Sequence, residues 1–115
     1  MEIKIVRDAI TREELCAIAE RQFGDLVKAV VDVGKEVMAI GGELHADGEV
    51  LLMEQEGSNR EHTWGINLYP DKPDEEWIEF DSIVNIKPSY GNRSRVVEDR
   101  AVREKIRIII KKLVH

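Results

Sequence analysis

An apolar stripe at helical spacing ends the chain and limits the folds that it can adopt. Residues three and four apart lie side by side on a helix, so one face is formed by Val102, Ile106, Ile109, Ile110 and Leu113. Acidic residues precede the stripe and two lysines follow near its end, which suits the two poles of the helix dipole. A helix of this kind has to bury its stripe against another element, so the rest of the chain must supply an apolar surface.

A second helix is predicted over residues 12–23. Thr11 and Glu14 have the spacing of a capping box, in which the Thr11 hydroxyl accepts from the Glu14 N–H and the Glu14 carboxylate accepts from the Thr11 N–H. Ile10 and Leu15 flank this cap as a hydrophobic staple. Independent local signals therefore agree on the start of the helix.

Five segments rich in β-branched residues have the pattern of strands, and they cover residues 2–7, 26–33, 36–40, 63–70 and 77–87. Gly34-Lys35 predicts a hairpin between the second and third segments. The acidic, Pro-containing loop 70–76 predicts that the last two pair antiparallel. We therefore predict one α+β domain over residues 1–115, with a mixed, largely antiparallel sheet of about five strands and the N-terminal and C-terminal helices packed on it.

Residues 43–55 fit two structures. As a strand, the segment would place four polar side chains, from Glu43 to Glu49, on one face. As a helix, it would have Asp47 as its N-cap and Gly57 at its end. We favour an extended start to about His45, followed by a short helix through Gln55.

Charge is divided unevenly along the chain. The formal net charge is −6, yet residues 1–86 hold 8 Lys/Arg and 20 Asp/Glu, whereas residues 87–115 hold 9 Lys/Arg and 3 Asp/Glu. A basic C-terminal part could meet nucleic acid, phosphate or an acidic partner. The alternative, which we favour, is that the basic helix packs over an acidic sheet of its own chain.

The sequence also bounds the cellular context. Its longest apolar runs are only a few residues, and its start lacks the pattern of a signal segment. The single cysteine, Cys16, excludes an internal disulfide. These features predict a cytoplasmic protein that does not contact membranes.

The stretch Phe80–Arg95 combines the parts of an anion site. Pro88 has no N–H for a ladder and should end a strand, while Gly91-Asn92 accommodates a sharp turn. Two arginines, a hydroxyl and free backbone N–H groups then precede the last helix. The candidate ligand-binding residues are Lys87, Asn92, Arg93, Ser94 and Arg95. The alternative is a turn and helix lead-in, in which Asn92 or Ser94 bonds the free N–H groups and the arginines pair with the acidic half.

The candidate catalytic residues are His45 and Asp47, which lie among further carboxylates. His45 would act as general acid or base with Asp47 orienting it, and Arg93 and Arg95 would stabilise charge that develops on a phosphate. The sequence has none of the spaced Cys/His pairs typical of zinc sites, so we predict neither a metal nor a cofactor. The competing interpretation is a solvated acidic edge and a helix cap.

Three segments resemble those of a family of short uncharacterised prokaryotic proteins known as a domain of unknown function. They are GGELHADGE (Gly41–Glu49), WGINLYP (Trp64–Pro70) and FDSIVNIKPSYGNRS (Phe80–Ser94). The similarity runs through nearly the whole chain in the same order. It implies a stand-alone cytoplasmic domain, and it carries over no activity, cofactor or catalytic residue.

Together these patterns predict a small cytoplasmic protein that binds a phosphate-bearing ligand, a nucleotide or RNA, through the Lys87–Arg95 loop. One alternative is a small hydrolase or nuclease that uses His45 and Asp47 with Arg93 and Arg95. Another is a non-catalytic structural or interaction protein. A symmetric homodimer is also predicted, since an open sheet leaves edges that pairing commonly covers.

Overall fold

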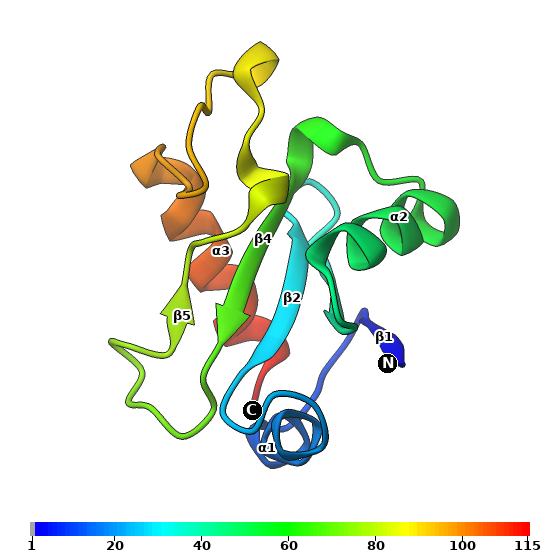
Figure 1. Cartoon of the computed structure of the whole chain (residues 1–115), viewed down its shortest axis with the longest axis vertical. Helices are drawn as coiled ribbons and strands as arrows, with labels where there is room; N and C mark the ends of the chain where they lie inside the picture. Colours follow the sequence, from blue (N-terminus) through cyan, green and yellow to red (C-terminus); the bar gives the residue numbers. More distant parts are fainter. Residues whose placement is uncertain (1) are drawn as a thin grey trace.

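Five strands form one antiparallel sheet in the computed structural model, which describes residues 2–115 (Figure 1). Their order across the sheet is β1-β3-β2-β4-β5, so β1 and β5 are the edges. The strands are Ile3–Val6 (β1), Val27–Asp32 (β2), Val37–Gly41 (β3), Thr63–Leu68 (β4) and Ile78–Glu79 (β5). Each neighbouring pair is antiparallel, so the expected sheet is confirmed and contains no parallel pair of strands.

Helices cover both faces of the sheet. Helices α1 (Arg12–Arg21) and α3 (Arg100–Leu113) pack on one face, where they enclose the larger of two apolar clusters. Helix α2 (His45–Glu56) packs on the other face, where Leu52 meets Val30 and Ala39. The single domain is therefore α+β as expected, with a third helix besides the two terminal ones. Because both faces are covered, β4 is buried along its whole length instead of on one side.

The two terminal helices follow their sequence signals. The Thr11 hydroxyl accepts the Glu14 N–H at 3.0 Å, and the Glu14 carboxylate accepts the Thr11 N–H at 3.5 Å, so the capping box is present. The Asp99 carboxylate accepts the Ala101 N–H and starts α3. The predicted stripe faces the core, where the buried residues of α3 are Ile106, Ile109, Ile110 and Leu113.

Helix α2 begins at His45 and ends at Glu56, and Leu44 before it is extended, which agrees with the extended start and short helix that we favoured for residues 43–55. Leu44 is the N-cap and makes no side-chain cap bond, so the prediction that Asp47 caps the helix is wrong. Gly57 ends α2 in the left-handed region, at φ 65°, as expected. Gly48 allows the helix to approach the sheet closely, because a Cβ there would lie 3.2 Å from Val30 Cγ2. This packing brings the start of α2 next to β4.

The strand predicted over Trp77–Lys87 is wrong beyond its first residues, since β5 contains only two. The Ser82 hydroxyl instead caps a short 3-10 turn, η2 (Ile83–Asn85). The carboxamide of Asn85 takes the place of the missing strand: it accepts the N–H of Gly65 at 2.8 Å and donates to the carbonyl of Gly65 at 2.9 Å. A side-chain amide thus completes the edge of β4 that a longer β5 would have covered.

Candidate functional site

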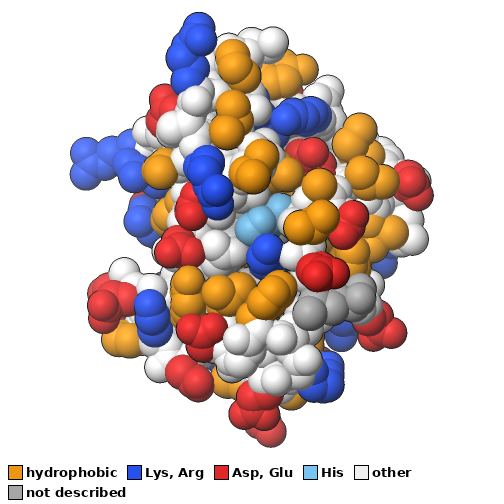
Figure 2. Space-filling model, in the orientation of Figure 1, with side chains coloured by type: hydrophobic (Ala, Val, Ile, Leu, Met, Phe, Trp, Pro, Cys, Tyr) orange, Lys and Arg blue, Asp and Glu red, His pale blue; other side chains and the backbone are white. Residues whose placement is uncertain are grey.

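A hollow of about 520 Å³ opens between the start of α2, strand β4 and the segment 81–84. On the face drawn in Figure 2, a histidine lies near the centre, with hydrophobic side chains and charged side chains of both signs around it. The hollow has apolar walls formed by Phe23, Leu26, Leu44, Ile83 and Val84. Its polar lining consists of Lys28, His45, Asn67, Asp81, Ser82 and Arg95. The volume and the mixture of apolar walls with a few polar groups are typical of small-molecule sites.

His45 is held in one tautomer at the first residue of α2. Its Nε2 lies 2.8 Å from the carbonyl oxygen of Ile66 in β4. Because a carbonyl only accepts, Nε2 carries the proton, and Nδ1 of the neutral ring is a bare acceptor. Burial lowers the pKa of His45 and outweighs the opposing effect of the bond to Ile66. The imidazole is therefore neutral at pH 7, and its hydrogen bond to Ile66 uses Nε2.

The carboxamide of Asn67 has an equally fixed orientation. Its Nδ2 donates to Glu79 Oε1 at 2.8 Å and to the carbonyl of Asp81 at 3.3 Å. Both partners only accept, so the amide cannot be turned over. Asn67 is 8% exposed, and its Oδ1 is buried without a hydrogen-bond partner among the residues that the structure describes. An unpaired buried acceptor costs about 1–3 kcal/mol, which a ligand donor at this position would recover.

Positive charge lies at the opening of the hollow. Arg95 Nε donates to Asp81 Oδ1 at 2.9 Å, and Lys28 Nζ donates to the carbonyl of Glu43 at 2.9 Å. Both cations carry further N–H donors beyond these bonds. Helix α2 begins at the same place without a side-chain cap, so its first N–H groups and the positive end of its dipole add to the field. The opening is therefore suited to an anionic group.

Lys87 lies in the interior, away from the hollow. Its ammonium group donates to the carbonyl oxygens of Arg60 and Thr63 and lies 3.9 Å from Glu49 Oε2. It also lies 4.8 Å from the centroid of the Trp64 ring, in a cation–π contact. Burial lowers the pKa of Lys87 to about 8, although Glu49 raises it. The side chain is thus committed to holding the loop on the fold.

We expect the contribution of Lys87 to stability to rise with pH between about 8 and 10.5. In this window the unfolded chain keeps Lys87 protonated while the folded chain has released the proton, so a higher pH removes the cost of burying the charge. Urea titrations of the wild type and of Lys87→Met measure this effect as the difference between their free energies of unfolding. The wild-type value minus the Lys87→Met value should rise by about 2 kcal/mol between about pH 8 and about pH 10. Burial also raises the pKa of Cys16 and of Tyr69, which makes stability fall as the pH rises. Both residues are present in the wild type and in the variant, so these effects cancel in the difference between the two proteins. A difference that stays constant with pH would contradict this expectation.

The backbone N–H groups of the predicted anion loop are bonded to the chain's own Glu98. One oxygen of this carboxylate, Oε2, accepts the N–H of Arg93 at 3.0 Å and both the N–H and the hydroxyl of Ser94 at 2.8 Å. The hydroxyl of Ser94 is the largest cause that lowers the pKa of Glu98. Asn92 is buried and ties the loop from inside, since its Nδ2 donates to the carbonyls of Asn85, Ser94 and Val96.

The structure brings two of the predicted site residues together. His45 and Arg95 both line the hollow. Asp47 and Arg93 are exposed and lie outside its lining. The carbonyl of Ile66, and not the carboxylate of Asp47, orients the imidazole.

Lys28, Asn67 and Asp81 were not identified from the sequence. Asn67 carries one signal, because it is a polar residue within a strand in which every residue is buried. In the sequence it alternates with apolar residues, which is typical of a position that faces solvent. The burial of Asn67 therefore becomes visible only in the tertiary structure, where α2 and the segment 81–85 cover that face of β4.

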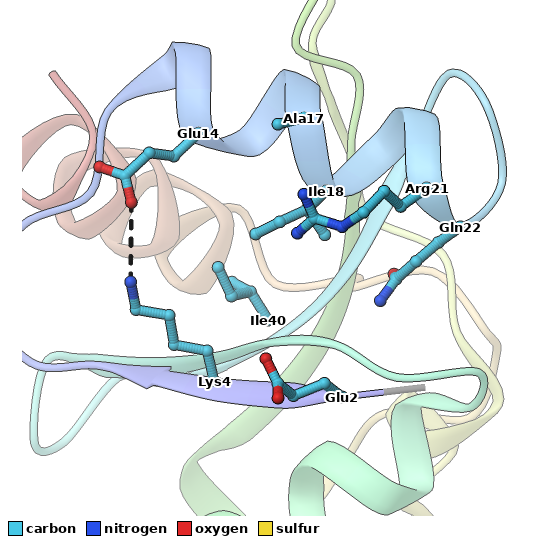
Figure 3. A pocket seen from close by; sticks show the side chains of 8 residues that line it. All are labelled: Glu2, Lys4, Glu14, Ala17, Ile18, Arg21, Gln22 and Ile40. Atoms are coloured by element: carbon cyan, nitrogen blue, oxygen red, sulfur yellow. Dashed lines mark ion pairs between the residues drawn. The ribbon is translucent and has the colours of Figure 1, made fainter.

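A second groove, of about 530 Å³, separates α1 from the edge strand β1 (Figure 3). Lys4 and Glu14 form an ion pair across it at 3.6 Å, with about half of each side chain exposed. Gln22 Oε1 is buried there without a partner among residues 2–115. The charged lining residues are all exposed: Glu2, Lys4, Glu14 and Arg21. The hollow at His45 instead combines apolar walls with buried polar groups, and we take it as the candidate site.

Neither a metal cluster nor a membrane-spanning helix occurs in the part of the chain that the structure describes. Within residues 2–115, no three His, Cys, Asp or Glu side chains gather closely enough to hold a metal ion. None of the helices over the same range combines the length and the apolarity that crossing a membrane requires.

The sequence matches a family model over residues 4–113, almost the whole chain. The chain therefore belongs to the family DUF5674, described as a protein of unknown function. No curated protein and no solved structure matches the chain. The expected membership of a family of unknown function is confirmed, and any function has to be argued from the hollow itself.

Proposed function

We propose that this protein binds a phosphate-bearing small molecule in the hollow at His45. The proposal rests on the meeting of three features: basic side chains at the opening, the uncapped start of α2, and the unpaired oxygen of Asn67. The first two favour an anion, because helix N-termini and guanidinium groups both stabilise phosphate. The third favours a hydrogen-bond donor. A phosphate ester of a hydroxyl- or amino-bearing compound carries both kinds of group.

Arg95 is the residue of the predicted loop that would contact the phosphate. Its side chain is 55% exposed and uses Nε for Asp81, so both terminal nitrogens keep donors for a ligand. Lys28 would approach the same anion from β2. Lys87 and Asn92 would act indirectly, by holding the loop that carries Arg95. Arg93 lies outside the lining of the hollow, and it serves as a matched control.

Titration calorimetry at low salt tests the proposal with inorganic phosphate and a panel of nucleoside monophosphates. Arg95→Ala should raise the Kd at least ten-fold, since a hydrogen bond to a charged group contributes about 1.5–3 kcal/mol. Arg93→Ala should change the Kd less than about two-fold, because exposed charges outside a site contribute little. The proposal fails if the wild type binds none of these compounds, or if both substitutions have the same effect.

RNA is tested in the same titrations as the polyanion alternative. A protein that neutralises several phosphates loses affinity steeply with salt through counterion release. The ligand would be a nucleic acid, and not a small molecule, if the protein bound a short RNA with such a salt dependence and bound no mononucleotide.

A small hydrolase is the second candidate function, and the neutral His45 favours it. Its bare Nδ1 could take a proton from water near pH 7, because burial keeps the pKa of the ring below its ordinary value. Arg95 would then stabilise charge that develops on the phosphate. Phosphate release during incubation with a bound ester separates the two functions. Turnover that His45→Ala abolishes would make the protein an enzyme, and absence of turnover by the wild type would leave it a binding protein.

A symmetric homodimer in the cytoplasm, or a purely structural interaction role, remains a prediction. Strand β1 is the open edge of the sheet. The other edge is partly covered, since the Ser82 N–H donates to the Arg95 carbonyl and the Val97 N–H donates to the Phe80 carbonyl. Pairing of two copies would therefore involve β1, where the charged Lys4 on the strand opposes close association.

A further inference from the structure

Exposed apolar side chains gather around the hollow. Three large ones that line it are strongly exposed: Phe23 at 39%, Leu44 at 56% and Ile83 at 67%. They come from three separate parts of the chain, after α1, before α2 and in η2, so only the fold brings them together. Exposed apolar surface around a concave site is typical of places where the apolar part of a ligand is covered. The walls of the hollow are therefore suited to an apolar group.

The polar side chains between these walls already use much of their bonding capacity within the chain. The Nε2 of His45 and the Nδ2 of Asn67 both bond to other parts of the fold. Ser82 is buried, and its hydroxyl accepts the N–H of Val84 at 3.3 Å. A sugar or a nucleobase would bring several polar groups out of water, and each group left without a partner weakens binding. An aliphatic chain has no such groups, so the lining favours it over a nucleoside.

Positive charge borders the apolar walls directly. Lys28 Nζ lies 5.1 Å from the centroid of the Phe23 ring, so the cation and the apolar wall adjoin. Arg95 and Ile83 both line the same hollow. A ligand that matches both kinds of surface has an anionic group joined to an apolar chain.

We propose that the carbon part of the phosphate ester is aliphatic for most of its length. It lies against the three exposed apolar side chains while the phosphate meets Lys28 and Arg95. This inference rests on the proposed function and names the ligand class as a phosphate monoester of an aliphatic alcohol. The net charge of −6 opposes approach to an anionic lipid surface, so the ligand is a dissolved monomer.

Titration calorimetry of the wild type with methyl, butyl and hexyl phosphate and with AMP tests this assignment. These compounds share the phosphate and differ in the carbon part. A fully buried methylene raises affinity about four-fold, so hexyl phosphate should bind at least ten-fold more tightly than methyl phosphate even with part of its chain exposed. AMP should bind no more tightly than methyl phosphate, because its base and sugar find few partners in the hollow.

Ile83→Ser should lower the ratio of hexyl to methyl phosphate affinity at least three-fold, because it removes one apolar wall and leaves the basic side chains in place. Ile86→Ser is the matched control. Ile86 is the same residue type directly after η2, is 38% exposed and does not line the hollow. This control should keep the wild-type ratio. If Ile83→Ser does not fold, the chain-length series in the wild type decides.

The titrations separate the two proposals. Equal affinities for the three alkyl phosphates, or tighter binding of AMP than of hexyl phosphate, would overturn the aliphatic assignment and leave the phosphate site standing. Sedimentation with vesicles of phosphatidylcholine and phosphatidic acid, without binding of any dissolved alkyl phosphate, would overturn the assignment to a monomer. Absence of binding by inorganic phosphate and by every ester would overturn both proposals.

Discussion

We expect Ile106→Ala to lower the free energy of unfolding by about 2–5 kcal/mol, as measured by urea denaturation. Ile106 lies on the apolar face of α3, is 0% exposed and belongs to the larger core cluster. Truncation removes buried methyl and methylene groups and leaves a cavity that the surrounding helix and sheet fill only in part. The midpoint should fall with little change in the slope of the transition.

Ile108 supplies the control for this substitution, because it is the same residue type on the opposite face of the same helix. It is 60% exposed, so Ile108→Ala should cost clearly less, under about 1 kcal/mol. Helix propensity favours alanine slightly and works in the same direction at both positions. Equal losses would contradict the assignment of the buried face, or would show that a second copy of the chain covers the outer face of α3.

Asn85→Ala should destabilise the fold by about 3 kcal/mol, because it leaves several buried backbone groups unpaired at once. The carboxamide bonds both the N–H and the carbonyl of Gly65, and it also donates to the carbonyl of Arg95 at 3.0 Å. Asn85 is 0% exposed, so water cannot replace these bonds without local opening. Asn85 directly follows the segment 81–84 that lines the hollow, so ligand affinity should fall together with stability.

Asn59→Ala is the matched control for this effect. Asn59 has the same type of side chain, and its carboxamide oxygen accepts the N–H of Glu61 at 2.9 Å, but at an exposed 3-10 turn. Loss of such a cap costs about 0.5–2 kcal/mol, and solvent can satisfy the freed N–H. Similar losses in the two variants, measured by urea denaturation, would show that Asn85 does not replace a strand.

The sequence alone determined the elements whose stabilising contacts are local. The two residues of the capping box, Thr11 and Glu14, are three positions apart, and the stripe of α3 depends only on helical periodicity. The hairpin of β2 and β3 follows from two β-branched runs around a glycine. Contacts of this range are encoded by spacing, so the α+β class and both terminal helices could be predicted.

Tertiary packing decided the boundaries in the middle of the chain. Helix α2 starts at His45 and not after Asp47, in the packing where Gly48 meets Val30 on the sheet. Strand β5 ends early because the carboxamide of Asn85 takes over its pairing with β4. Gly48 is far from Val30 in the sequence, and Asn85 is far from Gly65, so no local pattern carries the information.

For the candidate site, too, the sequence indicated the residue types and the tertiary structure decided which groups are available. Residue types in the loop indicated an affinity for anions, and Arg95 does reach the hollow. The sequence could not show that Lys87 is buried against backbone carbonyls, or that Glu98 bonds the free N–H groups. The capacity of a side chain to donate or accept is a property of the residue, whereas long-range packing decides whether that capacity is already used within the chain. Only the tertiary structure therefore distinguishes the acceptors left unpaired at the hollow, such as Asn67 Oδ1, from the polar groups that hold the fold together.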